Sequence, residues 1–239
     1  AAYREAEKYA KERVQFKKAI KEMIPVTEML ANMKVKIEAG RTLLYETAII
    51  VDIKNGLEHI IEKYPEREKD LKEELKKYTA LAALFTPMVK AYNTEMGNQV
   101  CYDAIQIHGG TGFMKEFNVE RHYRDVRITN IYEGTTQLQV VAAIGGIVKG
   151  VAIEKLNEYD KEFSCISDSS LHKFAKEMKD LTEKAIAYVR EKDDPDYQEY
   201  HARRLVEMVT YTTIAYLMLR DACYSERKKD VAKYFMELY

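Results

Sequence analysis

The sequence predicts an all-α protein, a bundle of long helices followed by a small helical extension. Only 4 prolines and 10 glycines occur in 239 residues, so long segments contain no helix breaker. Several of these segments place apolar residues at helical spacing, whereas no segment shows a strong strand-like alternation. We therefore expect two helical domains, the bundle over residues 1–154 and an additional domain over residues 155–239.

Composition gives no sign of a nucleic-acid-binding, membrane-spanning or disulfide-bonded protein. The formal net charge is -1, which argues against nucleic acid or an anionic membrane as a partner. No apolar run approaches the roughly 18 residues of a membrane span. Cys101, Cys165 and Cys223 are too widely spaced for a disulfide framework or a C-x-x-C metal pair, which is typical of a reducing cytoplasm. We expect a cytoplasmic protein.

The first half of the chain predicts two helices and a charged hairpin. Residues 2–16 interleave alanine with charged residues and predict a first helix. Pro25 suits the first turn of a second helix, which we expect to run to about Lys54 and to stop at Asn55-Gly56. Residues 58–77 are strongly charged and predict a helical hairpin in solvent, with an apolar stripe too short for a coiled-coil partner site.

The second half continues the helical pattern. Residues 81–107 predict a buried helix with a kink at Pro87. Residues 136–148 are almost uncharged, so this helix should lie deep in the bundle. Two or three more helices should come beyond Glu154, and residues 164–170 are interpreted as a polar linker. The helix at about 197–223 is apolar on two sides and should be sandwiched between neighbours.

The stretch from residue 106 to residue 139 holds most of the loop chemistry of the chain. Gly109, Gly110 and Gly112 follow a helix, where exposed backbone N–H groups let an anionic ligand approach closely. Helix-ending glycines are common, so a phosphate or nucleotide site and a simple helix stop both remain open. Glu133 is either an acid favoured by a helix dipole or a carboxylate beside a dry pocket, where desolvation makes it a general base.

Other kinds of catalytic site find no support in the sequence. Helical bundles hold di-iron centres through Glu-x-x-His pairs, but none of the 5 histidines has a Glu three residues before it, so we expect no metal. Cys101 lies in a helical apolar pattern, which is typical of packing rather than of a nucleophile.

Two segments resemble the acyl-CoA dehydrogenase family. The first comprises Gln106–Phe113 (QIHGGTGF), Val119–Arg121, Arg124–Arg127 and Ile131–Thr135 (IYEGT), followed by Gln137 and Gln139. The second, Tyr9–Phe16, resembles the Glu-Arg-x-x-Phe segment of the family and lies at a compatible distance upstream. The resemblance covers roughly residues 1–150, which are similar to the C-terminal helical domain of the family. The charged insertion at 54–80 and the helices after 155 resemble a longer-chain branch with a C-terminal extension.

The resemblance implies an enzyme that uses FAD to desaturate an acyl-CoA thioester between its α and β carbons. Glu133 matches the carboxylate that removes the α-proton while hydride leaves the β-carbon for the flavin. The main-chain N–H of Glu133 matches a donor that polarises the thioester carbonyl as enolate character develops.

The resemblance also implies the cofactor residues and the partners. Arg13 and Gln15 match positions that reach the FAD pyrophosphate of a neighbouring subunit, with Phe16 close by. Gln106, Gly109 and Gly110 match the segment that cradles the adenosine part across a subunit interface, and Thr135 and Gln137 match contacts to FAD from their own subunit. A homo-oligomer, dimer or tetramer, is therefore implied, with acyl-CoA as substrate and electron-transfer flavoprotein or a similar protein as electron acceptor.

Some positions depart from the pattern of the family. Lys17 stands where the family usually has glycine, Val140 and Gly145-Gly146 replace basic residues, and His108 is interpreted as a packing group. In the family, an N-terminal helical domain and a middle β domain complete the flavin site. We therefore expect the chain to be the C-terminal piece of a longer enzyme, able to fold but inactive by itself. Alternatives are a same-fold flavoenzyme such as an acyl-CoA oxidase, or a non-catalytic helical interaction module.

Overall fold

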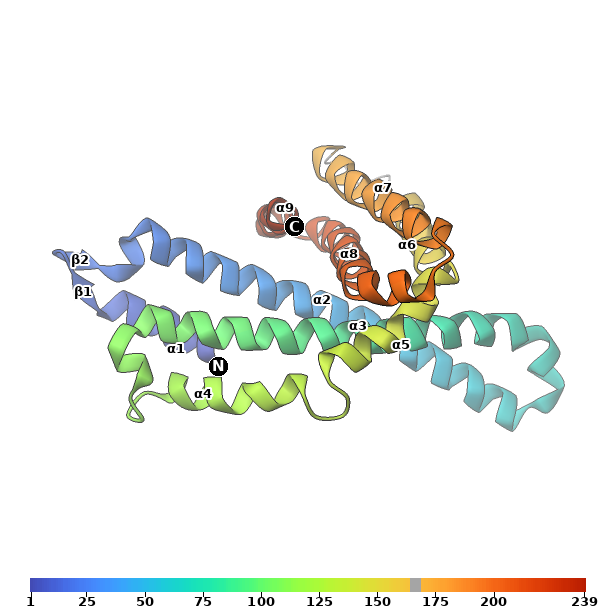
Figure 1. The fold of residues 1–239 in the computed structure, drawn as a ribbon, viewed down its shortest axis with the longest axis horizontal. Helices are drawn as coiled ribbons and strands as arrows, with labels where there is room; N and C mark the ends of the chain where they lie inside the picture. Colours follow the sequence, from blue (N-terminus) through green and yellow to red (C-terminus); the bar gives the residue numbers. More distant parts are fainter. Residues whose placement is uncertain (164–168) are drawn as a thin grey trace. The chain divides into compact units, whose positions relative to one another are not determined.

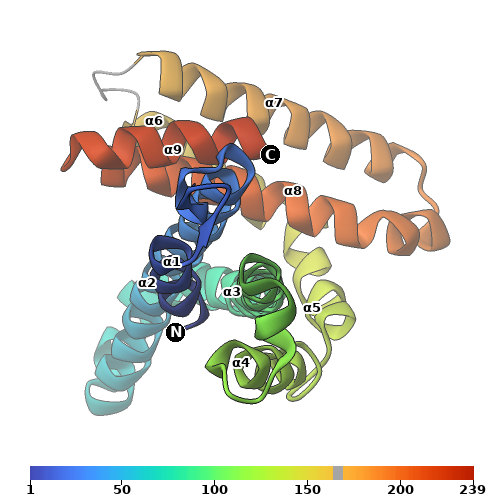
Figure 2. The ribbon, with the colours of Figure 1, turned by 90° about the vertical axis from the view of Figure 1, so that its left-hand side faces the viewer.

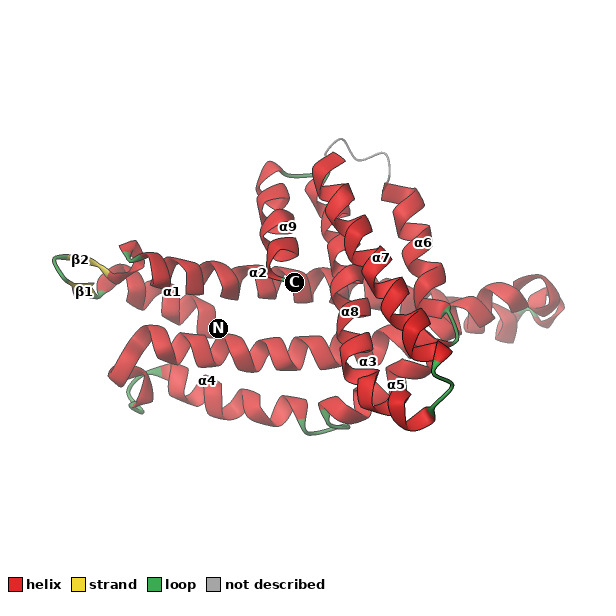
Figure 3. Ribbon diagram, turned by 45° about the horizontal axis from the view of Figure 1, so that its top comes forward, coloured by secondary structure: helices red, strands yellow, loops and turns green. Residues whose placement is uncertain are grey.

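The structure is a computed structural model that describes residues 1–163 and 169–239, and these residues are almost entirely helical (Figures 1 and 3). The all-α prediction is thereby confirmed for the described ranges. Their strands are limited to a two-stranded hairpin of two residues each. Residues 164–168 of the predicted linker, with Cys165, lie outside the described residues.

Helices follow one another along almost the whole chain, and the short 3-10 helices among them are marked η. In chain order the elements are α1 (Ala2–Glu12), β1 (Val14–Gln15), β2 (Lys18–Ala19), η1 (Ile20–Glu22), α2 (Ile24–Lys63), η2 (Pro65–Arg67), α3 (Glu68–His108), η3 (Gly109–Phe113), α4 (Asn118–Val126), η4 (Arg127–Asn130), α5 (Thr136–Val148), α6 (Val151–Phe163), α7 (Ser169–Glu191), α8 (Pro195–Ala222) and α9 (Glu226–Leu238).

Two predicted helix ends are wrong. The first helix ends at Glu12 and not at Phe16, because Arg13 takes an extended backbone (ψ 121°) and the chain turns back as a hairpin. The second helix continues through Gly56 to Lys63. Burial of Leu57, 8% exposed, outweighs the cost of about 1 kcal/mol for a glycine inside a helix.

The helical hairpin is confirmed. The turn follows Tyr64, whose backbone leaves the helical region because Pro65 comes next. The start of α3 beyond η2 is largely exposed, as expected for a solvated hairpin, and α3 continues through Pro87. Residue 154 lies inside α6, and the division into domains at 1–154 and 155–239 remains a prediction.

The chain forms two compact units. Unit 1 comprises residues 1–40 and 91–136, and unit 2 comprises residues 41–90 and 137–239. The division falls within α2 and α3, so each of these two long helices contributes one end to each unit.

Unit 1 is built on the alanine face of α1. Ala2, Ala6 and Ala10 recur every four residues and are buried, so α1 can approach α4 closely (Figure 1). The core around them consists of Ile20, Met33, Val100, Cys101, Ala104, Ile107 and Val119. Burial raises the pKa of the Cys101 thiol, which agrees with packing rather than nucleophilic reactivity.

Unit 2 is organised around α8. This helix contacts α6, α7 and α9 (Figure 2), and consecutive residues along it, such as those from Thr212 to Leu219, are buried on every side. The prediction that this helix is sandwiched between neighbours is confirmed. Among the described helices no single one is long and apolar enough to cross a membrane. Only α5 and α6 taken together, with a bend of 70° between them, reach that length and composition.

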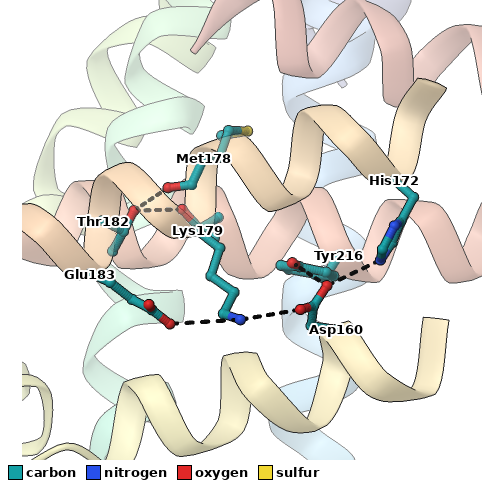
Figure 4. A network of polar contacts seen from close by, with 8 residues as sticks. Asp160, His172, Met178, Lys179, Thr182, Glu183 and Tyr216 are labelled. Atoms are coloured by element: carbon teal, nitrogen blue, oxygen red, sulfur yellow. Dashed lines mark hydrogen bonds and ion pairs between the residues drawn. The ribbon is translucent and has the colours of Figure 1, made fainter. Parts of the chain in front are cut away.

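Asp160 of α6 joins three helices of unit 2 (Figure 4). Its carboxylate accepts from Lys179 Nζ at 3.2 Å and Tyr216 Oη at 3.0 Å, and it lies 3.1 Å from His172 Nε2. Burial alone would raise the pKa of Asp160, but the hydrogen bonds from Lys179 and Tyr216 outweigh it and hold this pKa below its ordinary value. The charged carboxylate therefore stabilises the packing of α6 on α7 and α8.

We predict that Asp160→Asn lowers the free energy of unfolding by about 1.5–3 kcal/mol at pH 7, because it removes hydrogen bonds to a charged group. The folded pKa lies below the unfolded one, so this contribution is present above pH ~4 and is lost as the pH falls through the folded pKa. Urea unfolding followed by circular dichroism between pH 3 and pH 7 measures both effects. Asp180→Asn, the same change at an exposed position of α7, should cost less than about 0.5 kcal/mol. Equal effects of the two variants at pH 7 would contradict this role of Asp160.

Candidate functional site

A tight hairpin follows α1. Val14 pairs with Ala19, and Gln15 pairs with Lys18, in antiparallel register. The turn residues Phe16 and Lys17 both have positive φ, 52° and 69°, as two-residue hairpin turns require. Neither is glycine, so each costs about 1–2 kcal/mol in backbone strain. Lys17, which stands where the family usually has glycine, therefore permits the turn but strains its backbone.

The glycines after α3 have different roles. Gly109 ends α3 with φ +60°, and a Cβ at Gly109 or at Gly110 would meet no atom within 4 Å. A Cβ at Gly112 would lie 2.8 Å from both Ile105 O and His108 Cβ. The chain therefore folds back on α3 at Gly112, and its backbone stays open at Gly109 and Gly110.

His108 connects the end of α3 to α1. Its Nδ1 lies 2.8 Å from the carbonyl oxygen of Ala104 and must donate to it, since a carbonyl only accepts. Its ring stacks on Tyr9 with centroids 4.3 Å apart. The Thr111 hydroxyl lies 2.7 Å from His108 O and 3.1 Å from the Tyr9 hydroxyl. His108 is a packing group, as its sequence position indicated.

A cleft of about 610 Å³ opens in unit 1 between the hairpin and the end of α3. It is lined by Tyr9, Arg13, Gln15, Ile20, Ile107, His108, Gly109, Gly110, Thr111 and Met114. Four predicted cofactor residues, Arg13, Gln15, Gly109 and Gly110, therefore meet at one place. Within the described part of the chain, no carboxylate forms an ion pair with the Arg13 guanidinium. The cleft thus combines a cation with open backbone, which suits an anionic ligand.

The remaining predicted residues lie outside this cleft lining. Phe16 is 88% exposed at the hairpin turn, and Gln106 lies on an exposed face of α3. Sequence reasoning did not select Tyr9, Thr111 or Met114 as lining residues. Tyr9 could have been found because it lies on the last turn of α1, where its carbonyl oxygen accepts from the Arg13 N–H.

Glu133 lies in the turn between η4 and α5. Its φ is 52°, and Gly134 follows with φ 93°. Glu133, Thr135 and Gln137 are all exposed, and Gln137 is the second residue of α5. Left-handed backbone is unfavourable for a residue with a Cβ, and such strain is often found at functional sites. Among the described residues no group of three or more His, Cys, Asp or Glu side chains could hold a metal ion.

Two family descriptions match the chain. Residues 1–64 and 69–144 match the family described as "Acyl-CoA dehydrogenase, C-terminal domain", and residues 148–238 match "Acyl-CoA dehydrogenase C terminal". The unmatched residues 65–68 lie at the turn between α2 and α3. The chain therefore belongs to the acyl-CoA dehydrogenase family, of which it matches the C-terminal region.

Curated relatives match about three fifths of the chain. The caffeyl-CoA reductase-Etf complex subunit CarC of Acetobacterium woodii is 39% identical over 145 residues, which are 61% of this chain and 32% of that protein. The 3-(aryl)acrylate reductase of Clostridium sporogenes is 36% identical over 149 residues, 62% of this chain and 33% of that protein. The chain spans about a third of the length of these relatives.

Solved structures share the fold along nearly the whole chain. ACDH-11 of Caenorhabditis elegans in complex with C11-CoA has a TM-score of 0.78 at 17% identity, and the match covers 98% of this chain and 39% of that chain. An acyl-CoA dehydrogenase of Bacillus anthracis complexed with FAD has a TM-score of 0.73 at 22% identity, over 99% of this chain and 43% of that chain. At these identities the likeness concerns the fold alone.

We predict that Gly112→Ala lowers the free energy of unfolding by about 1–3 kcal/mol, because its Cβ would collide with the backbone of α3. Urea unfolding measures this loss. Gly110→Ala is the matched control, since its Cβ would enter open space, and its stability should stay within about 0.5 kcal/mol of wild type. If Gly110→Ala were the more destabilising of the two, the described geometry of this segment would be wrong.

Proposed function

We propose that this chain is the C-terminal part of an FAD-dependent enzyme that desaturates an acyl-CoA thioester between its α and β carbons. The observation that carries the proposal is the cleft of unit 1, which is lined by two motifs, one from each of the two sequence segments of that unit. Arg13 and Gln15 come from the hairpin, and Gly109 and Gly110 come from the end of α3. The family membership supports the same activity.

The residues of the cleft fit a diphosphate. A cation without a carboxylate partner among the described residues can form charge-assisted hydrogen bonds with phosphate oxygens. The bare backbone at Gly109 and Gly110 lets such oxygens approach the main chain. Arg13 and Gln15 would hold the FAD pyrophosphate, with Gln106, Gly109 and Gly110 at its adenosine part. FAD, when bound, supplies the acceptor for the hydride that leaves the substrate.

Glu133 is proposed as the general base. Its carboxylate takes the proton from the α-carbon, and the β-hydrogen leaves with its electron pair as hydride, so a carbon-carbon double bond forms. The main-chain N–H of Glu133 would donate to the thioester oxygen as negative charge develops there. Thr135 and Gln137, which follow the turn, would contact FAD of the same subunit.

The reverse reaction is a second candidate, favoured by the names of two relatives. The proteins from Acetobacterium woodii and Clostridium sporogenes are a caffeyl-CoA reductase subunit and a 3-(aryl)acrylate reductase. In that direction Glu133 would deliver its proton to the α-carbon of an unsaturated acyl group. The same residues serve both directions, because each step is the reverse of the other. An acyl-CoA oxidase would differ in its reactivity with oxygen, and a non-catalytic module would show no reaction.

The proposed partners are further subunits of the same chain, an acyl-CoA substrate and an electron-transfer protein. Phe16 and Gln106 lie at the surface of this chain, which suits contacts with FAD shared between subunits of a homo-oligomer. Acyl-CoA is the proposed substrate. Electron-transfer flavoprotein is the proposed electron partner, because the relative from Acetobacterium woodii is described as a subunit of an Etf complex. A cytoplasmic location remains part of the proposal.

We predict that Glu133→Gln slows flavin bleaching by about 10²–10⁴-fold in the FAD-loaded enzyme that contains this chain. Gln keeps the shape of the side chain and cannot take the α-proton. The measurement is anaerobic bleaching by butyryl-, octanoyl-, palmitoyl- and 3-phenylpropionyl-CoA, with substrate dissociation constants determined alongside. Equal bleaching of wild type and variant would place the base elsewhere and would overturn the proposed role of Glu133.

We predict that Arg13→Ala weakens FAD binding by roughly 10- to 100-fold, the loss expected for hydrogen bonds to a charged group. Equilibrium dialysis of FAD against the enzyme measures the dissociation constant. Arg4→Ala is the matched control, because Arg4 lies on α1, which leads directly to Arg13, is exposed and does not line the cleft. An unchanged FAD affinity in Arg13→Ala would show that the cleft does not hold the diphosphate.

A further inference from the structure

Glu95 of α3 contacts both ends of the segment that carries Glu133. Thr136 Oγ1 donates to Glu95 Oε1 at 2.6 Å, and Asn130 Nδ2 donates to the same oxygen at 3.3 Å. Asn130 is the last residue of η4, and Thr136 is the first residue of α5. The residues between them, 131–135, therefore begin and end beside one carboxylate oxygen.

The segment held in this way has a strained backbone. Glu133 has φ 52°, a left-handed conformation that is unfavourable for any residue with a side chain. Such a conformation persists where the surrounding structure fixes it. The N–H groups of Ile131 and Tyr132 both donate to Ile128 O at 3.0 Å, which fixes the first half of the turn. The contact of Thr136 with Glu95 fixes its far end.

The part of α3 around Glu95 is itself fitted closely to this region. Asn98 Nδ2 donates to Val126 O at 3.3 Å and to Thr94 O at 2.8 Å, which joins α3 to the end of α4. A Cβ at Gly97 would lie 3.3 Å from Val126 Cγ2, so the two segments approach closely there. Glu95, half-buried on this stretch of α3, thus has a defined position relative to the turn.

We propose that Glu95 is a positioning residue that holds Glu133 in place for proton transfer, an inference that rests on the proposed role of Glu133 as base. Glu95 acts through Asn130 and Thr136 rather than by touching the substrate. A carboxylate forms shorter and stronger hydrogen bonds than a neutral acceptor, which agrees with the 2.6 Å contact to Thr136. Precise placement matters because a displacement of about 1 Å at a reacting group can slow a reaction roughly 100-fold.

The test compares Glu95→Ala with Glu95→Gln in the FAD-loaded enzyme, with the panel thioester that bleaches wild type fastest. Glu95→Ala should slow anaerobic bleaching by about 10- to 100-fold, while the dissociation constant of the thioester changes by less than about threefold. Glu95→Gln keeps an acceptor oxygen in the same place and should stay within about fivefold of wild type. Asp103→Ala removes another carboxylate of α3, one that accepts from Gln99 at 3.0 Å, and should bleach at the wild-type rate.

A second measurement does not depend on activity. Deuterium uptake by the backbone amides of 131–135, followed by mass spectrometry, should be faster in Glu95→Ala than in wild type and unchanged in Asp103→Ala. Unchanged uptake in Glu95→Ala would mean that Glu95 does not hold the turn.

The outcomes separate this inference from the proposed function. If Glu133→Gln bleaches slowly and Glu95→Ala bleaches at the wild-type rate, the role of Glu95 is overturned and that of Glu133 stands. If Glu133→Gln bleaches at the wild-type rate, the proposed base fails, and with it the role of Glu95 in proton transfer. Should Glu95→Ala not fold, Thr136→Val decides, because it removes one donor and keeps Glu95. It should bleach about tenfold more slowly than wild type, and a wild-type rate would overturn the proposal.

Discussion

The last turn of α3 joins three parts of unit 1 that depend on one another. His108 donates to Ala104 within the helix and stacks on Tyr9 of α1, so the buried ring holds the two helices together. Gly112 then brings the chain back against Ile105, and this close approach leaves Gly109 and Gly110 facing open space. The hairpin that carries Arg13 follows directly from α1. The contacts of Tyr9 with His108 and with Thr111 therefore link the Arg13 side of the cleft to its glycine side.

Long helices could be predicted because their signal is distributed over many residues. The sandwiched α8 follows from its apolar spacing, and the helix at 136–148 was also predicted. That helix does not lie deep in the bundle, however, because Leu138 and Val141 are more than half exposed. Helix ends depend on few residues and were predicted less well. At Gly56 the local stop signal was outweighed by burial of Leu57, which depends on tertiary packing. At Phe16 and Lys17 the turn uses positive φ without glycine or asparagine, so the sequence contains no local sign of it.

In the candidate site, too, residues of a sequence motif could be predicted, whereas residues that depend on tertiary contacts could not. The motif residues Arg13, Gln15, Gly109 and Gly110 were selected by resemblance, and the fold brings them to one cleft. Glu95 escaped notice, because its partners are 35 and 41 residues away in sequence and neither contact leaves a local pattern. Tyr9 was named only as the first residue of the segment Tyr9–Phe16, although it also lines the cleft. Residues that position other residues through long-range contacts are the hardest to predict from a sequence.

The left-handed backbone at Glu133 has an evolutionary consequence. Glycine or asparagine would occupy this position with less backbone strain than glutamate. Drift in a lineage that had lost the reaction would tend to replace the acid with one of these residues and gain stability. Under the proposed function, glutamate at this position therefore combines a strained backbone with the general base.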